Sequence, residues 1–282
     1  NKEEIIKFKE GLNQLNIYLS EHQYLQFRQF FDMLEEKNKV MNLTAITDGV
    51  EVVQKHFIDS LTIVKSHDMM EVDSVIDIGT GAGFPGIPIK IAFPHLEMIL
   101  VDSQEKRVNF VNEVIDALGL TKIRCIHGRA EDLAHEKDFR EKFDLCVSRA
   151  VANLAVLAEY CMPFVKPQKG SFVAYKSGNM NEELAGARNA INMLGGEVKQ
   201  EIAFFLPDTP GSKIHGAVKP LDGEPVIIKH APDAFFQTDL HDALSRAGIR
   251  KLVVCGMMSH MCIDTSVRAA RSHGYDITLL HD

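Results

Sequence analysis

The sequence has no tryptophan, few cysteines and no apolar run of membrane-spanning length. A helix that crosses a bilayer needs about 20 consecutive, mostly apolar residues, so we expect no contact with a membrane. The first ten residues are rich in Lys and Glu, a composition too charged for a secretory signal peptide. These absences predict a cytoplasmic protein. At 282 residues, of which 45% are hydrophobic, the chain is expected to contain more than one domain.

The cysteines do not follow a disulfide pattern. Their number is odd and no two have C-x-x-C spacing, which argues against a disulfide framework. We expect the first three to be buried apolar thiols, and no metal site is implied. The five are Cys125, Cys146, Cys161, Cys255 and Cys262.

Positive charge is in the minority, since 31 Lys and Arg face 39 Asp and Glu for a formal net charge of -8. Phosphate contacts need Lys and Arg, so the balance weighs against a nucleic-acid partner. A local basic surface can still coexist with an acidic remainder; alternatively, the basic residues are scattered on solvated faces. The candidates for RNA contact are Lys37, Lys39, Lys106, Arg107 and Lys176, with Lys55, Lys166 and Lys169 as further basic positions.

A glycine-rich turn is the most informative feature that is present. An apolar run, 75–78, is followed by Gly79, Gly81 and Gly83. Glycine permits positive φ and lets a ligand approach the backbone, and the helix that follows offers free N–H groups. The pattern predicts a nucleotide-like cofactor at a strand-to-helix turn. By itself the turn does not separate nicotinamide cofactors from S-adenosylmethionine.

Two aspartates end neighbouring apolar runs and narrow that choice. Asp77 places a carboxylate where a methionine ammonium would lie and where a pyrophosphate would be repelled. Asp102 follows the next run, at the position from which an acid accepts hydrogen bonds from both ribose hydroxyls. The alternative for each is an ordinary helix or turn cap.

The periodicity of apolar residues predicts helices first and an alternating pattern after residue 74. Helical spacing covers Ile5 to Leu15, Ser20 begins a second helix as a capping box, and a third carries His56 and Asp59. We interpret His56 as a packing residue. The alternation predicts a parallel, doubly wound sheet. Its expected strands are Val75 to Ile78, Met98 to Val101, Ile123 to Ile126, Phe143 to Val147 and Phe172 to Tyr175.

Six motifs, in order over residues 1 to about 207, carry a resemblance to a known family. They are Asn42 to Ile46, His56 to Ser60, Asp77 to Pro88, Val101 to Ser103 with Lys106 and Arg107, Gly128 to Glu131, and Ser148 to Ala152. The chain resembles the bacterial 16S ribosomal RNA guanine-N7 methyltransferases, also called the glucose-inhibited division protein B or RsmG-like family. Lys37 departs from the pattern, because the family usually has a tryptophan there.

The resemblance implies an α/β fold, with a helical N-terminal region before a Rossmann-like class I methyltransferase sheet. It implies S-adenosylmethionine as cofactor, bound by Gly79 and Phe84 at the turn, by Ala130 and Glu131 around the adenine, and by Arg149 after the fourth strand. The alternative for Arg149 is a solvated charge at a strand end. The implied partner is small-subunit ribosomal RNA or the ribosomal subunit.

The absence of a Ser-His-Asp or paired-carboxylate arrangement fits this chemistry. Guanine N7 is an in-plane lone pair and attacks a sulfonium methyl group without first losing a proton. No general base is needed, so we expect residues that position the reactants and none that transfers a proton. The target guanine must be accessible in a loop or flipped out of its helix.

Residues 209 to 282 resemble a different family, the isochorismatase-like cysteine hydrolases, through Thr209 to His215 and Val253 to Cys262. The resemblance implies Cys262 as nucleophile and Lys229 as the residue that holds its thiolate. The aspartate that this family carries on its first strand is not found before Thr209, so we expect an incomplete remnant. The alternatives to the methyltransferase are therefore a cysteine amidohydrolase and a noncatalytic chimera of the two families.

These resemblances divide the chain into a helical region, 1–68, a cofactor-binding domain, 69–207, and a partial α/β isochorismatase-like segment, 208–282. In the last segment we expect three parallel strands, Val226 to Lys229, Leu252 to Cys255 and Ile277 to Leu280, with helices over Asp239 to Ala247 and Cys262 to Ser272. Such a half-domain would expose apolar sheet edges, which predicts weak stability or self-association.

Overall fold

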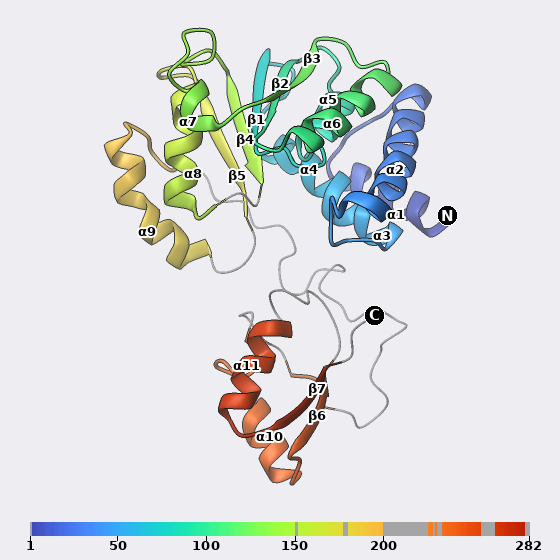
Figure 1. Cartoon of the computed structure of the whole chain (residues 1–282), viewed down its shortest axis with the longest axis vertical. Helices are drawn as coiled ribbons and strands as arrows, with labels where there is room; N and C mark the ends of the chain where they lie inside the picture. Colours follow the sequence, from blue (N-terminus) through green and yellow to red (C-terminus); the bar gives the residue numbers. More distant parts are fainter. Residues whose placement is uncertain are drawn as a thin grey trace. The chain divides into compact units, whose positions relative to one another are not determined.

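The computed structural model describes residues 2–149, 152–176, 180–199, 225–227, 229, 233–254 and 263–279. The chain divides into two units, and the described residues fall at 2–199 in the first and 225–279 in the second (Figure 1).

The first unit is built around a five-stranded sheet in the order β3-β2-β1-β4-β5, and every pairing is parallel. The five predicted strands are confirmed with small shifts of their ends. Parallel pairing follows from the alternation of strands with helices along the sequence. The strands are β1 (Ser74–Ile78), β2 (Glu97–Asp102), β3 (Ile123–His127), β4 (Leu145–Arg149) and β5 (Ser171–Tyr175).

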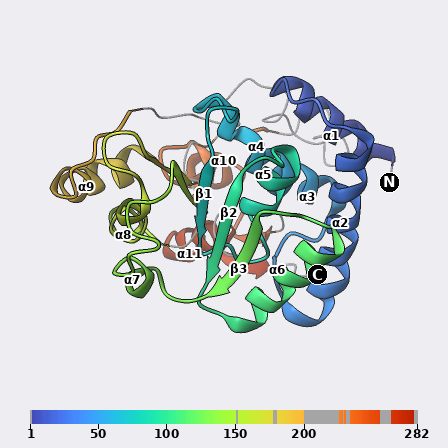
Figure 2. The same ribbon diagram turned by 90° about the horizontal axis from the view of Figure 1, so that it is seen from above.

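Helices cover both faces of this sheet, so the central strands read as near-continuous apolar runs. The helices α5 (Gly86–Ala92) and α6 (Glu105–Ala117) lie on one side, and α7 (Ala130–Leu133), α8 (Leu154–Cys161) and α9 (Met180–Met193) on the other (Figure 2). A core on the α7 and α8 side contains Ile76, Cys146, Leu157 and Phe164. The arrangement is a Rossmann-like α/β fold, as expected.

The N-terminal helices are α1 (Lys2–Gln14), α2 (Glu21–Met41), α3 (Gly49–Val52) and α4 (Asp59–Leu61). A π-helix, η1 (Val53–Ile58), joins α3 to α4, and a 3-10 turn, η2 (Thr62–Lys65), follows. The predicted capping box is confirmed, because Ser20 accepts from the Gln23 backbone while the Gln23 side chain accepts from the Ser20 backbone. This exchange satisfies two N–H groups that a helix start leaves free.

Glutamine side chains on α2 attach it to the ends of two sheet-covering helices. Gln23 donates to the Ile91 carbonyl at 2.7 Å, and Gln26 donates to the Leu118 carbonyl at 2.8 Å. Carbonyls in the last turn of a helix lack intrahelical partners. The two amides therefore fix α2 against the carboxyl ends of α5 and α6.

An aromatic cluster joins the N-terminal helices to the glycine turn. The Phe30 ring is fully buried, with its centroid 5.1 Å from Phe84 and 5.7 Å from Phe57. Phe84 belongs to the turn that follows β1, whereas Phe57 lies on η1. The helical region is thus packed against the part of the sheet that carries the candidate site.

The second unit contains α10 (Leu240–Arg246), β6 (Lys251–Val254), α11 (Asp264–Ser272) and β7 (Asp276–Leu279). The strands β6 and β7 pair in parallel. The expected strand from Val226 to Lys229 is not formed in the described residues of that range, which show no ladder to β6. An apolar, β-branched run is not a strand until a neighbour supplies the hydrogen bonds.

Within the described parts of the chain, no helix combines the length and the apolar character needed to cross a membrane.

Replacing Phe30 with Ala is expected to lower the free energy of unfolding of the first unit by about 3 to 5 kcal/mol, because it leaves a cavity in the aromatic cluster. Phe31→Ala removes the same atoms from the same helix at a half-buried position and should cost less. Urea unfolding followed by circular dichroism measures both. Equal losses in the two variants would contradict the role given to Phe30.

Candidate functional site

The glycine turn after β1 is held against the end of β2 by its own backbone. The N–H groups of Gly79 and Thr80 both donate to the Val101 carbonyl, at 2.9 and 3.0 Å. Gly79, Gly81 and Gly83 have φ values of 73°, 60° and 97°. Positive φ is costly for residues with a Cβ, so the sequence places glycine where the turn reverses.

The glycines of this turn differ in what surrounds them. A Cβ at Gly83 would lie 2.7 Å from Ile87 Cγ1, and one at Gly86 would lie 2.8 Å from Asp77 Oδ2. Packing therefore leaves no room for a Cβ at either position. A Cβ at Gly81 would meet no atom within 4 Å. Gly81 therefore borders open space, where a ligand can approach the backbone.

Asp77 is the buried polar group at the centre of the site. It has no exposed surface, and its Oδ2 accepts from Thr80 Oγ1 at 2.7 Å and from the Gly86 N–H at 2.9 Å. Its Oδ1 is buried and has no hydrogen-bond partner among the described residues. Burial raises the pKa of Asp77 to about 7, against the lowering effect of these two donors. A buried oxygen without a donor is costly, and a cationic donor would relieve that cost.

Asp102, at the end of β2, supports the turn directly. Its Oδ2 accepts from the Gly81 N–H at 2.9 Å, and its Oδ1 accepts from the Gln104 N–H at 2.9 Å. Arg107 Nη1 lies 3.7 Å from the same carboxylate. The carboxylate therefore has a capping role here, which was the alternative to ribose binding. A carboxylate oxygen has two lone pairs, so these bonds leave acceptor capacity for a ligand hydroxyl.

The predicted adenine-side residues lie after β3, next to β2 in the sheet. Asp102 is in register with His127 at the end of β3. Ala130 begins α7 and is buried, whereas Glu131 is exposed. Because the carboxyl ends of parallel strands share one edge, the sheet brings Asp77, Asp102 and Ala130 to the same edge.

Arg149, the last residue of β4, is held by the N-terminal helices. Its Nη1 donates to the Lys55 carbonyl at 3.1 Å and to Asp59 Oδ2 at 3.2 Å. Its guanidinium carbon lies 5.0 Å from the centroid of the Phe84 ring, within the range of a cation–π contact. The side chain is 16% exposed, so Arg149 is not the freely solvated charge of the alternative interpretation.

His56 joins this group and was interpreted from sequence as a packing residue. Its ring is buried and stacks on Phe84 at 4.7 Å, which agrees with that prediction. Its Nε2 is 2.8 Å from Thr44 Oγ1, and its Nδ1 is 3.3 Å from Arg149 Nη2. Burial, and then the charge of Arg149, lower the pKa of His56 to about 3. The contact with Arg149 was missed, although His56 and Asp59 both lie in one of the motifs.

The profile of the rRNA small subunit methyltransferase G family matches residues 23–207. The chain belongs to this family. It is 54% identical to the ribosomal RNA small subunit methyltransferase G of Lachnoclostridium phytofermentans, over 72% of this chain and 83% of that protein. Its counterpart from an Exiguobacterium species is 49% identical, over 71% of this chain and 84% of that protein.

The basic residues considered for RNA contact fall into two groups in this member of the methyltransferase G family. Lys37 pairs with Glu113 at 2.8 Å, and Lys176 pairs with Glu183 at 2.6 Å. Lys39 and Lys106 are exposed, and the described residues form no ion pair with either. The second group is therefore better placed to meet a phosphate backbone. Arg107 lies 3.7 Å from Asp102, so it belongs with Lys37 and Lys176, the basic residues that pair with carboxylates.

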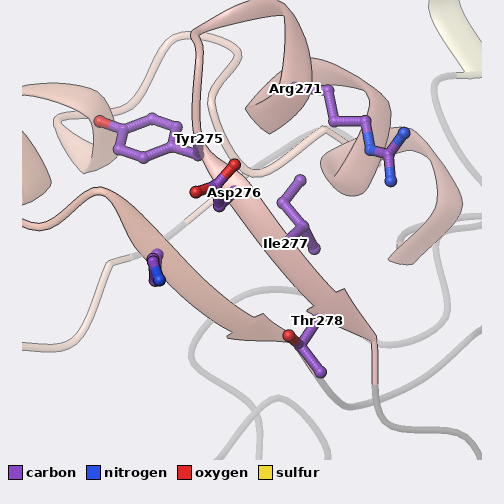
Figure 3. Close-up of a pocket in the computed structure, with 6 residues that line it drawn as sticks. Arg271, Tyr275, Asp276, Ile277 and Thr278 are labelled. Carbon is purple, nitrogen blue, oxygen red and sulfur yellow. The ribbon is translucent and has the colours of Figure 1, made fainter.

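A second profile, that of the isochorismatase domain, matches residues 192–282. Of the two residues expected to carry hydrolase chemistry, Lys229 is described and Cys262 lies outside the described residues. A hollow of about 560 Å³ lies beside β7, lined by Lys251, Arg271, Tyr275, Asp276, Ile277 and Thr278. Figure 3 shows these side chains around β7. Lys229 is not among the residues that line it.

Metal ligands do not gather in the described parts of either unit, where no three His, Cys, Asp or Glu side chains are grouped to hold an ion.

The raised pKa of Asp77 predicts a pH-dependent stability. A carboxyl with a folded pKa of about 7 and an unfolded pKa of 3.8 holds its proton more tightly in the folded state. Its stabilising contribution is complete below the unfolded pKa and is lost as pH rises through about 7. The free energy of unfolding should fall by roughly 2 kcal/mol between about pH 5.5 and pH 8 from this group.

Asp77→Asn keeps the size of the side chain and removes the titration. Urea unfolding of both proteins at the two pH values isolates the contribution of Asp77 as the difference between their pH dependences. The same slope in wild type and variant would show that Asp77 is ionised throughout.

Proposed function

We propose that the first unit transfers a methyl group from S-adenosylmethionine to N7 of a guanine in 16S ribosomal RNA. One observation carries the proposal: Asp77 Oδ1 is buried, has no hydrogen-bond partner among the described residues, and belongs to a glycine turn whose Gly81 borders open space. Membership in the methyltransferase G family supports both the cofactor and the RNA substrate.

The residues present fit S-adenosylmethionine. Asp77 Oδ1 lacks the donor that the methionine ammonium carries, and binding would convert a costly buried oxygen into a charge-assisted hydrogen bond. The backbone of Gly79 and Gly81 allows the cofactor close approach. The spare lone pairs of Asp102 accept from the ribose hydroxyls, and Ala130 with Glu131 flanks the adenine.

The cofactor, when bound, supplies the electrophilic methyl group. The chain's own residues bind, orient and exclude water, since the N7 lone pair attacks without losing a proton. Asp77 would hold the ammonium end of the cofactor through its charge, and the glycine turn would place its backbone against the cofactor. We assign no proton-transferring residue to this unit.

The RNA partner is proposed to be small-subunit ribosomal RNA, free or in the ribosomal subunit, which places the reaction in the cytoplasm. Lys39 and Lys106 are the best candidates for phosphate contact, because both are exposed and free of ion pairs among the described residues. Because the net charge is -8, the protein as a whole repels RNA. Local contacts from these lysines would offset that repulsion.

For the chain as a whole we propose three parts: the helical region, 1–68, the cofactor-binding domain, 69–207, and the isochorismatase-like segment, 208–282. The profile matches at 23–207 and 192–282 support a change of family near residue 208. The last segment is further proposed to self-associate, because Val253 and Leu279 on its paired strands are 67% and 46% exposed.

Gly81→Ala is expected to abolish methyl transfer and to weaken S-adenosylhomocysteine binding by at least about tenfold, because the new Cβ enters the space that the cofactor would use. Gly119→Ala is the matched control. Gly119 has a φ of 62°, against 60° for Gly81, and also borders open space. The two variants therefore carry the same backbone strain, and only one lies at the proposed pocket.

The measurements are calorimetric titration with S-adenosylhomocysteine, and transfer of labelled methyl to 16S RNA or small subunits from cells that lack this modification. Modified guanines are identified by mass spectrometry of nucleosides. Wild-type protein that binds no cofactor and transfers no methyl would overturn the proposed function and favour a noncatalytic chimera. An equal loss of affinity and methyl transfer in Gly81→Ala and Gly119→Ala would show that backbone strain alone, and not contact with the cofactor, causes the loss.

Self-association is expected to appear as a sedimentation coefficient of the full chain that rises with protein concentration. Val253→Thr, which keeps the β-branched shape and replaces one methyl group with a hydroxyl, should weaken it, whereas Val40→Thr is a control at an exposed apolar residue of the first unit. A concentration-independent monomer would contradict the proposal.

A further inference from the structure

Arg149 has hydrogen-bond donors to spare at the candidate site. A guanidinium has five N–H groups in a fixed plane. Nη1 donates to the Lys55 carbonyl and to Asp59, and one Nη2–H lies toward His56 Nδ1, at an Nη2–Nδ1 distance of 3.3 Å. The Nε–H and the second Nη2–H have no partner in the described part of the chain. Arg149 is thus fixed on one edge and free on another.

His56 connects Arg149 to the residues of the N-terminal region. Its Nδ1 lies 3.3 Å from Arg149 Nη2 and 3.2 Å from the Lys55 carbonyl. Its Nε2 lies 2.8 Å from Thr44 Oγ1, a hydroxyl that can donate or accept. Thr44 is fixed in turn by Asn38, which bonds both its N–H and its carbonyl at 2.9 Å.

The three residues that contact the Arg149 guanidinium come from one short stretch of chain. Lys55 and His56 lie in the π-helix η1, and Asp59 begins α4 immediately after it. π-helical turns are rare and are frequent at functional sites. Burial raises the pKa of Asp59, while the charge of Arg149 opposes that shift and favours the carboxylate.

Two opposite charges meet at the same edge of the sheet. Asp77 is near the end of β1 and Arg149 is at the end of β4, and these strands are parallel neighbours. The methionine end of S-adenosylmethionine carries an ammonium and a carboxylate. Asp77 accounts for the ammonium, and the free edge of Arg149 has the geometry that binds a carboxylate.

We propose that Asp59, together with His56, is a positioning residue that orients Arg149 to bind the carboxylate of the methionine end of the cofactor. This inference rests on the proposed function. The helical region then takes part in cofactor selection without touching the cofactor, because Asp59 acts through Arg149.

Two ligands separate this role from a structural one. S-adenosylmethionine carries both charges, whereas decarboxylated S-adenosylmethionine keeps the ammonium and lacks the carboxylate. Asp59→Asn is expected to weaken binding of the first roughly tenfold and to change binding of the second by less than about twofold. Asp77→Asn should weaken both. Calorimetric titration of the full chain measures each affinity.

Asp144→Asn is the matched control. Asp144 pairs with Lys166 at 2.7 Å and its side chain is 26% exposed, close to the 28% of Asp59. It precedes β4, at the opposite end of that strand from Arg149. This variant should leave both affinities unchanged. If Asp59→Asn does not fold, Thr44→Val removes the hydrogen-bond partner of His56 Nε2. This variant should also lose affinity for S-adenosylmethionine selectively, by a smaller factor than Asp59→Asn.

The outcomes separate the two proposals. Wild type that binds neither ligand overturns the proposed function, and the positioning role with it. Wild type that binds S-adenosylmethionine, with Asp59→Asn losing affinity for both ligands equally or for neither, overturns the positioning role alone. Selective loss for the ligand that carries the carboxylate supports it.

Discussion

The buried carboxylate of Asp77 is the constraint on which the rest of the site depends. Through Oδ2 it ties the end of β1 to Thr80 and to the first residue of α5, Gly86, so it fixes the shape of the turn between them. Its other oxygen is buried without a donor, and burial raises the pKa to about 7. The fold keeps a group that lowers its stability, which is characteristic of binding sites whose missing partner is the ligand.

The N-terminal helices belong to the same functional structure as the sheet. Phe30 packs on Phe84 of the turn, and Asp59 pairs with Arg149 at the end of β4. A change in the helical region therefore alters the site through contact, without any change in the turn itself. This arrangement explains why the motif around His56 and the motif around Arg149, far apart in sequence, form one unit.

Each of the two units contains a parallel sheet, and the two sheets differ in the number of strands paired in the described residues. The first unit pairs five strands and covers both faces with helices. The second pairs two strands in the described residues and leaves Val253 and Leu279 exposed. Parallel strands are normally buried on both faces, whereas β6 and β7 expose apolar side chains in the described part of the chain.

The five strands, the capping box at Ser20 and the glycine turn could all be predicted from residue order, because each depends on local backbone preference or on the burial of a periodic face. Local pattern gave a wrong strand at Val226 to Lys229, where an apolar run has no ladder in the described residues. The contact between Asp59 and Arg149, which are 90 residues apart in sequence, could not be predicted and is seen only in the folded chain. Periodicity reports which face of an element is buried, whereas the pairing of distant side chains depends on how the elements pack.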